Sequence, residues 1–381
     1  MSVASEYDVI VVLGLETQPA TPHVLGSHHG ATRIIREAYF EHPSYVALLQ
    51  SAFAEWAALE SASGTSIFRQ TGCVSTSGTS GGECFPGALE SARLHGLEHE
   101  VLTAAELAAR CPGYRLEPGM SAVLEARGGV LCPERAVAAH AELAQRAGAT
   151  LLCGQKVVAW RSLTDAPGSE RAEVDVEGRA EPFVARRLVL VPGAWLPRLV
   201  PELAPLLKVE RQVVCWFQTT PEFAPHFAPE AFPVFVLDDE TGCYYGFPAD
   251  ADSFKIGRMH HRCQRTDPDA VDREVTAEDE AVLRQAVARY FPGADGPCTR
   301  SAVCLFTNTP DEHFVVDAHP CHRNVLFCSA CSGHGFKFAS VVGRILADLV
   351  EKDQTSHDIS LFRLSKQRKG HAQVLEAFQK Q

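Results

Sequence analysis

Residues 8–16 read DVIVVLGLE, an apolar run bounded by two acidic residues. Its first half, residues 8–12, has the β-branched composition of a buried parallel strand. Its second half, residues 12–16, has the composition of another such strand and ends in Glu16, the kind of acid that binds a ribose hydroxyl. In a complete βαβ unit a glycine-rich turn and a helix separate these strands, over about 30 residues. Here the two strand patterns follow each other directly.

The missing connection bears on cofactor binding. The pyrophosphate of a dinucleotide normally lies on the N-terminus of the first helix, over a G-x-G-x-x-G turn, and no such turn follows residue 12. We therefore expect an α/β dinucleotide-binding fold that is incomplete near its N-terminus and leaves apolar sheet uncovered. We expect Glu16 to contact the cofactor, and cofactor binding to be weakened or lost.

The composition narrows the class of protein. The chain has 381 residues, enough for two joined domains, and a net charge of −12, which argues against a nucleic-acid partner. No apolar run has the length of a membrane span, and the N-terminus has no signal-peptide pattern. The 13 cysteines are scattered, which favours free thiols in a reducing compartment. We expect a cytoplasmic protein, or as the alternative a peroxisomal one, although the C-terminal FQKQ is not a Ser-Lys-Leu-type signal.

Residue periodicity predicts the elements and their order. Helices are expected at 44–59, 103–110, 133–147, 276–290 and 336–350. Strands are expected in two groups, 150–153, 157–160, 173–176 and 188–191, then 213–218, 233–237, 243–247 and 254–259, with a last strand at 324–328. The Ser/Gly/Thr-rich residues 75–82 predict a surface loop.

This order predicts a Rossmann-like domain that an antiparallel substrate domain interrupts. We expect the first domain to comprise residues 1–60, 130–207 and 303–381. The substrate domain would comprise residues 61–129 and 208–302.

The first candidate site is residues 27–36, SHHGATRIIR, in which His28, His29, Arg33 and Arg36 surround a glycine. Arginines three apart share one face of a helix, and such a face suits a carboxylate or a phosphate. A solvated basic helix start is the equally weighted alternative. The two histidines have no third ligand at a metal-binding spacing, so no metal site is predicted.

The second candidate site is residues 332–337, SGHGFK, between an apolar strand and a helix. Such a turn lets backbone amides approach an anion or a polar ring edge. Lys337 would open the helix, where a cation is unfavourable unless it reaches solvent or an anion. Taken alone, Lys255 reads as a surface lysine and Cys304 as a core residue. The C-x-x-C of Cys328 and Cys331 ends a strand, which does not suit a redox dithiol.

Four segments in the same order resemble the monomeric sarcosine oxidase family of FAD-dependent amine oxidases, which also contains N-methyltryptophan and pipecolate oxidases. They are GSHHGATRIIREAY at 26–39, YYGFP at 244–248, VCLFTNTPDEHF at 303–314 and SGHGFKF at 332–338. The resemblance covers residues 13–362. It implies a glutathione-reductase-type FAD domain and oxidation of a small secondary amine acid, such as sarcosine or pipecolate. The imine product would hydrolyse, and oxygen would become hydrogen peroxide. We expect a monomer.

The resemblance also implies a role for each matching residue. Cys304 would carry FAD through a covalent thioether, and Lys255 would promote the reaction with oxygen. Arg36 and Lys337 would bind the substrate carboxylate, with Lys337 also against FAD. Tyr245 and His260 would line the substrate pocket, with His261 as the alternative to His260. The other residues expected to contact FAD are Ser27, His28, His29, Arg33, Gly333 and Gly335.

Three departures from the family pattern accompany the resemblance. Phe306 stands where tyrosine is usual, and Ala330-Cys331 replaces Gly-Phe. The glycine turn and first helix are absent although both flanks match, which favours an excised segment. An inactive apo variant is therefore the main alternative to an active oxidase. A nicotinamide-dependent dehydrogenase, which Glu16 alone would permit, is a third possibility.

Overall fold

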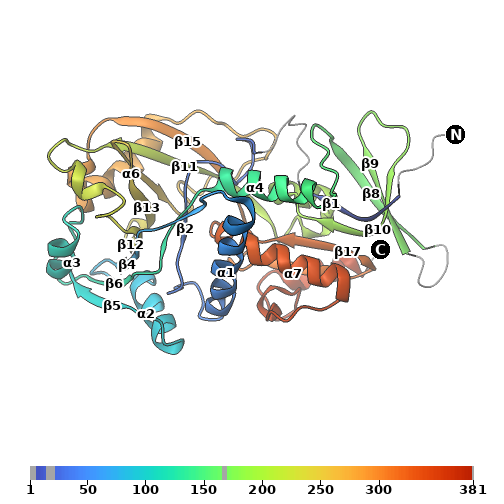
Figure 1. Ribbon diagram of the computed structural model, residues 1–381, viewed down its shortest axis with the longest axis horizontal. Helices are drawn as coiled ribbons and strands as arrows, with labels where there is room; N and C mark the ends of the chain where they lie inside the picture. Colours follow the sequence, from blue (N-terminus) through green and yellow to red (C-terminus); the bar gives the residue numbers. More distant parts are fainter. Residues whose placement is uncertain (1–5, 14–21, 165–169, 380–381) are drawn as a thin grey trace.

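The computed structural model describes residues 6–13, 22–164 and 170–379. Two large sheets lie toward the two ends of the long axis (Figure 1). Helix α1 (Tyr45–Ser63) lies near the middle of the molecule, beside α4 (Pro133–Arg146), and α7 (Ala339–Lys352) packs on the first sheet. None of the helices in the described ranges combines the length and the apolar character that a bilayer crossing requires.

The first sheet has six strands, of which three form parallel pairs. Its central strand β10 (Phe183–Leu190) pairs in parallel with β1 (Glu6–Val12) on one side and with β17 (His322–Ser329) on the other. The remaining strands are antiparallel: β8 (Val157–Thr164), β9 (Glu170–Val176) and β16 (Val315–His319). The α/β fold class predicted from the sequence is confirmed.

The second sheet has eight strands and forms the other end of the molecule. In spatial order they are β15 (Cys298–Asn308), β11 (Lys208–Gln218), β14 (Ser253–Arg258), β13 (Gly242–Asp250), β12 (Val234–Asp239), β4 (Cys73–Ser77), β6 (Ser121–Glu125) and β5 (Glu100–Thr103). Neighbouring strands are antiparallel, as predicted, except that β4 and β12 run parallel. A third, small sheet joins β2 (Arg33–Ile35), β7 (Gly129–Leu131) and β3 (Phe68–Gln70).

The predicted helices form, with ends shifted by a few residues. α3 (Ala104–Arg110) and α6 (Ala277–Tyr290) each begin with a capping box, in which Thr103 or Thr276 caps the first turn. α7 is preceded by a 3₁₀ turn, Phe336–Phe338. Three further short helices are α2 (Cys84–Leu94), α5 (Leu196–Leu199) and α8 (His371–Phe378). The proposed domain boundaries remain a prediction.

Three sequence predictions of local structure are wrong. Residues 150–153 form no strand. Residues 75–77 are not a surface loop but the buried end of β4, where Thr76 Oγ1 donates to the Ser121 carbonyl at 2.8 Å and Ser77 Oγ to Asp238 at 2.5 Å. These bonds satisfy the hydroxyls inside the sheet. Arg33 begins strand β2 and Arg36 follows that strand, so the two arginines do not share a helix face.

Strand β1 presents apolar side chains that no helix in the described ranges covers. Val11 pairs with Val189 in the parallel register, so both point to the face on which the helices pack. Val189 is buried, whereas Val9, Val11 and Leu13 are 36, 49 and 64% exposed. The helix layer therefore stops short of β1, where the first helix of a complete βαβ unit would lie. The predicted second strand falls mostly outside the described residues, and Glu16 lies outside them as well.

Candidate active site

A cavity of about 740 Å³ joins the two large sheets. Its second-sheet wall includes Tyr245 and Phe247 of β13 and Lys255 of β14. From this wall the cavity extends past the segment of residues 27–36 to β1, α4 and α7. The sequence-predicted residues that line it are Ser27, His28, Arg33, Arg36, Tyr245, Lys255, Cys304, Gly333, Gly335 and Lys337.

The loop between residues 27 and 33 is held by its own arginine. The Arg33 guanidinium donates to the carbonyls of Ser27, His29 and Thr32 at 2.7, 2.6 and 2.8 Å. From outside the loop, Glu134 at the start of α4 accepts from the amides of Gly30 and Ala31 at 2.8 and 3.0 Å. Arg33 thus fixes the backbone of the loop while its side chain lines the cavity.

Lys255 and Cys304 converge on Gly30. The buried Lys255 ammonium donates to the Gly30 carbonyl at 2.5 Å and to Thr32 Oγ1 at 2.9 Å. A side-chain carbon on Gly30, whose φ is +100°, would lie 3.7 Å from Lys255 Nζ and 4.0 Å from Cys304 Sγ. Burial, followed by the charge of Arg33, lowers the pKa of Lys255 well below its ordinary value. Lys255 is therefore not a surface lysine, and the buried Cys304 lines the cavity.

Two further basic residues, Arg36 and Lys337, line the same cavity. Arg36 is buried and pairs with Glu41, and its guanidinium stacks over the rings of Tyr39 and Phe40 at 4.2 and 4.6 Å. Lys337 Nζ donates to the Tyr39 hydroxyl at 3.1 Å and to the His334 carbonyl at 2.7 Å.

Burial, and then the charge of Arg36, lowers the pKa of Lys337 to about 7. Lys337 donates to no carboxylate in the described residues. A bound anion would supply the negative partner that the Lys337 ammonium lacks. The sequence predicted such a partner, because a cation at the start of a helix is otherwise unfavourable.

The turn at residues 332–337 needs its glycines. Gly333 has φ +75°, and a side-chain carbon there would lie 2.6 Å from the Phe306 ring. A side-chain carbon on Gly335 would lie 1.7 Å from the Ala330 carbonyl oxygen. The turn thus packs against the position where phenylalanine replaces the tyrosine of the family pattern.

The three residues 27–29 have different surroundings. Ser27 Oγ donates to the Leu305 carbonyl at 2.7 Å. Burial lowers the pKa of both His28 and His29 to about 4, so both are neutral at pH 7. His29 is buried, and its Nε2 has no hydrogen-bond partner in the described part of the chain. A buried polar atom of this kind suits a ligand group.

Neither of the two neighbouring histidines, His260 and His261, lines the cavity; Met259 does. His260 lies between two glutamates, with Nδ1 2.8 Å from Glu210 and Nε2 3.1 Å from Glu312. The hydrogen bond to Glu312 is the main cause that raises the pKa of His260 to about 9. His261 is buried against Asp279.

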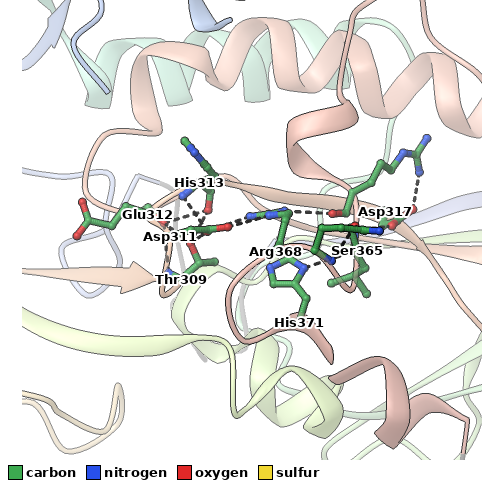
Figure 2. A network of polar contacts seen from close by, with 12 residues as sticks. Thr309, Asp311, Glu312, His313, Asp317, Ser365, Arg368 and His371 are labelled. Atoms are coloured by element: carbon green, nitrogen blue, oxygen red, sulfur yellow. Dashed lines mark hydrogen bonds and ion pairs between the residues drawn. The ribbon is translucent and has the colours of Figure 1, made fainter. Parts of the chain in front are cut away.

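The C-terminal segment is tied to the loop that carries Glu312 (Figure 2). Arg368 forms two bonds with Asp311, at 2.9 and 3.1 Å. In the same loop the Glu312 carbonyl lies 2.9 Å from His334 Nε2, and Glu312 also contacts His260. Residues 363–371 therefore support the loop that contacts His334 and His260, behind the candidate site. Sequence reasoning missed Glu41, Glu134, Glu312 and Arg368, because nothing local distinguishes them from surface charges.

Comparison with known proteins identifies the fold and relatives of this chain. The family model described as "FAD dependent oxidoreductase" matches residues 10–349. Monomeric sarcosine oxidase of Bacillus sp. (strain NS-129) is 40% identical over 91% of this chain and 88% of its own. N-methyl-L-tryptophan oxidase of Citrobacter koseri is 34% identical, over 91% and 90%. Among solved structures, the amino acid oxidase NikD shares the fold with a TM-score of 0.77 at 21% identity, covering 94% and 97% of the two chains.

Proposed function

Because the chain belongs to the FAD-dependent oxidoreductase family, we propose that it is an amine oxidase for a small N-alkyl amino acid, sarcosine, pipecolate or a related compound. The observation that carries the proposal is the grouping of cations in one cavity. Arg36 and Lys337 lie in one part of the wall, and Lys255 lies beside Cys304 in another. Two anchoring cations suit an amino-acid carboxylate.

The residues around Gly30 fit the ring system of FAD. A cavity lined by Arg33, Lys255 and Cys304 offers polar groups to a flat heterocycle. FAD, when bound, would accept a hydride equivalent from the carbon next to the amine nitrogen, which leaves an imine once the nitrogen loses its proton, and the two electrons with two protons would then reduce oxygen to hydrogen peroxide. We propose that Cys304 holds FAD covalently through its sulfur.

The chain's own residues position the substrate and shield it. Arg36 and Lys337 bind the carboxylate, and Tyr245 and Phe306 form walls that exclude water. In its protonated form, Lys255 would place a buried positive charge next to the proposed flavin ring, where oxygen acquires negative charge. The imine product is released and hydrolyses in water.

The phosphate end of the site fits less well. Beyond the ring site the cavity continues between Val11 of β1, Val137 of α4 and Leu346 of α7. Gly343, in the middle of α7, would meet nothing within 4 Å if it carried a side chain. The apolar walls, and the open space beside Gly343, are what we expect where a helix that would pack there is absent. We propose that an excised turn and helix weaken FAD binding, so that retention depends on the Cys304 thioether.

The first experiment tests flavin content. The purified protein is precipitated in acid, and a yellow pellet is expected, together with a white pellet from Cys304→Ser. Peroxide should then form with sarcosine or pipecolate and without added nicotinamide. If the wild-type pellet is white and the native protein is colourless, the chain is the inactive apo variant.

A rescue variant separates loss of FAD from a wrong assignment. A glycine-rich turn and a helix, inserted after Leu13, would rebuild the phosphate site. Flavin and peroxide should then appear or increase relative to an insert of equal length whose glycines are replaced by alanine. If the protein is colourless both with and without the glycine-rich insert, the proposal is overturned.

A further inference from the structure

Two thiols from different elements meet beside the cavity. The sulfurs of Cys84 and Cys243 lie 3.7 Å apart. Cys84 is the first residue of α2, and Cys243 lies in β13. Asp238, the partner of Cys243 in the β12–β13 register, accepts hydrogen bonds from the amides of Glu83 and Cys84 at 2.5 and 3.2 Å. The same carboxylate therefore holds the start of α2 over β13.

The two sulfurs differ in their access to the cavity. Cys243 lines it, on the same face of β13 as Tyr245 and Phe247. Cys84 is fully buried behind Cys243, in the apolar cluster that also contains Phe247. An oxidant that forms in the cavity would reach Cys243 first and Cys84 only through it.

We propose that Cys84 and Cys243 are a peroxide-reactive dithiol, which the hydrogen peroxide released in the cavity converts into a disulfide. The source of the oxidant rests on the proposed function, whereas the geometry of the pair does not.

The chemistry balances in two steps. The Cys243 sulfur attacks one peroxide oxygen, an S–O bond forms, the O–O bond breaks, and the leaving hydroxide takes up the thiol proton as water. The Cys84 sulfur then displaces the hydroxyl of the sulfenic acid, so that the S–S bond forms and a second water leaves. Two thiols lose two electrons and two protons, and one peroxide is reduced to two waters. Burial, followed by the hydrogen bond with Cys243, raises the pKa of Cys84, which keeps Cys84 protonated in the resting pair.

The disulfide would tie α2 to the cavity wall. The sulfurs must approach from 3.7 Å to about 2.05 Å, a movement that rotation of two side chains and a small shift of α2 can supply. Closing a long loop between positions 84 and 243 restricts the unfolded chain, so the oxidised protein should unfold about 5 °C higher than the reduced one.

Cys215 and Cys298 provide a matched internal control. They too are thiols on neighbouring strands, and the interaction with Cys215 is the main cause that lowers the pKa of Cys298. They lie in β11 and β15 and do not line the cavity. Peroxide from bulk solvent can reach the partly exposed Cys298, whereas peroxide formed in the cavity should react at Cys243.

The experiment uses reduced, full-length protein and mass spectrometry of non-reduced peptides. Hydrogen peroxide added without substrate should link the Cys84 and Cys243 peptides. Sarcosine turnover with catalase in the solvent should produce the same link and leave Cys215 and Cys298 reduced. Cys84→Ser should keep its activity and accumulate a sulfenic acid on Cys243 that dimedone traps.

Two results would overturn the proposal. One is the absence of the link after added peroxide under conditions that oxidise the exposed Cys321. The other is turnover that releases measured peroxide and leaves the pair reduced. If turnover releases no peroxide, the proposed oxidase function fails, and the arm with added peroxide still decides whether the dithiol site exists.

Discussion

Arg36 and Glu41 form a buried ion pair at the carboxylate end of the cavity, with Arg36 Nη2 2.9 and 2.7 Å from the two carboxylate oxygens of Glu41. Both residues line the cavity. The guanidinium proposed to bind the substrate therefore already has a carboxylate partner, five residues along the chain. A substrate carboxylate must share Arg36 with Glu41 or displace it, so Glu41 sets the affinity of the site.

Replacing Glu41 with glutamine should tighten carboxylate binding and weaken the fold. The variant leaves the buried Arg36 charge without its partner, which costs about 3 kcal/mol of stability. A bound carboxylate restores the pair, so the Kd of acetate or sarcosine should fall about tenfold. Thermal unfolding with and without acetate measures both effects, because a ligand that binds the folded state raises the midpoint.

The matched control for this variant is Glu230→Gln, which breaks the exposed pair with Arg69 and should change neither quantity. Equal acetate affinity in Glu41→Gln and wild type would show that Arg36 does not bind the carboxylate.

Carboxylate binding should weaken as the pH rises through about 7. Only the ammonium form of Lys337 attracts an anion, and burial lowers the pKa of this residue to about 7. Above this value, binding requires proton uptake, so the Kd should rise up to tenfold for each pH unit until the pKa of the bound state is reached. Acetate titrations between pH 6 and 9 measure the slope. Lys337→Gln should abolish it, and a slope that persists in this variant would assign the titration to another group.

The same pKa fixes the sign of a stability effect. The pKa of Lys337 in the folded protein lies below its ordinary value of 10.5. Between these values the unfolded chain binds more protons, so the ligand-free protein should become more stable as the pH rises from about 7 to 10.5. Lys337→Gln should flatten this rise, which urea unfolding at several pH values would detect.

The sequence predicted most of the elements because their signals are local. The Thr103 and Thr276 capping boxes and the proline at the start of α4 fix helix starts through nearby groups. The wrong predictions involve partners far along the chain. The buried Ser77 hydroxyl donates a hydrogen bond to Asp238, and no pattern near residue 77 reveals this partner. Residues 150–153 carry strand-forming side chains but form no strand.

The candidate site likewise contains residues that local motifs predict and residues that only the folded structure reveals. Segments 26–39 and 332–338 were found as motifs, and the structure brings both to the cavity. His260 was expected in the pocket, but the turn that contains it, at φ +53°, directs its ring to Glu210 and Glu312. Glu41 was missed because its importance comes from burial beside Arg36, which a sequence does not display. Burial and the contacts that the fold creates thus account for the part of the site that was not predicted.

Replacing Lys255 with methionine should slow the reaction with oxygen by about 100-fold or more, because the buried charge beside the flavin position is lost. The fold should lose little, since methionine fills the same space and a buried ammonium is costly. Stopped-flow mixing of the substrate-reduced protein with oxygen measures the step, and anaerobic reduction by substrate is the control that should change less. An unchanged oxygen step would remove Lys255 from the mechanism.

Replacing Arg368 with alanine should loosen the C-terminal segment and disturb the back of the site. Arg368 and Asp311 are largely buried, so removing one partner should cost about 3 kcal/mol of stability. The loop that carries Glu312 then loses its support, and the pKa of His260 should fall from about 9 toward its ordinary value, because the Glu312 hydrogen bond that raises it weakens. NMR titration of His260 and limited proteolysis after residue 360 measure the two effects. The exposed neighbour Lys366→Ala should change neither, and a variant that loses stability while His260 keeps its pKa would show that the C-terminal segment supports the fold and not the site.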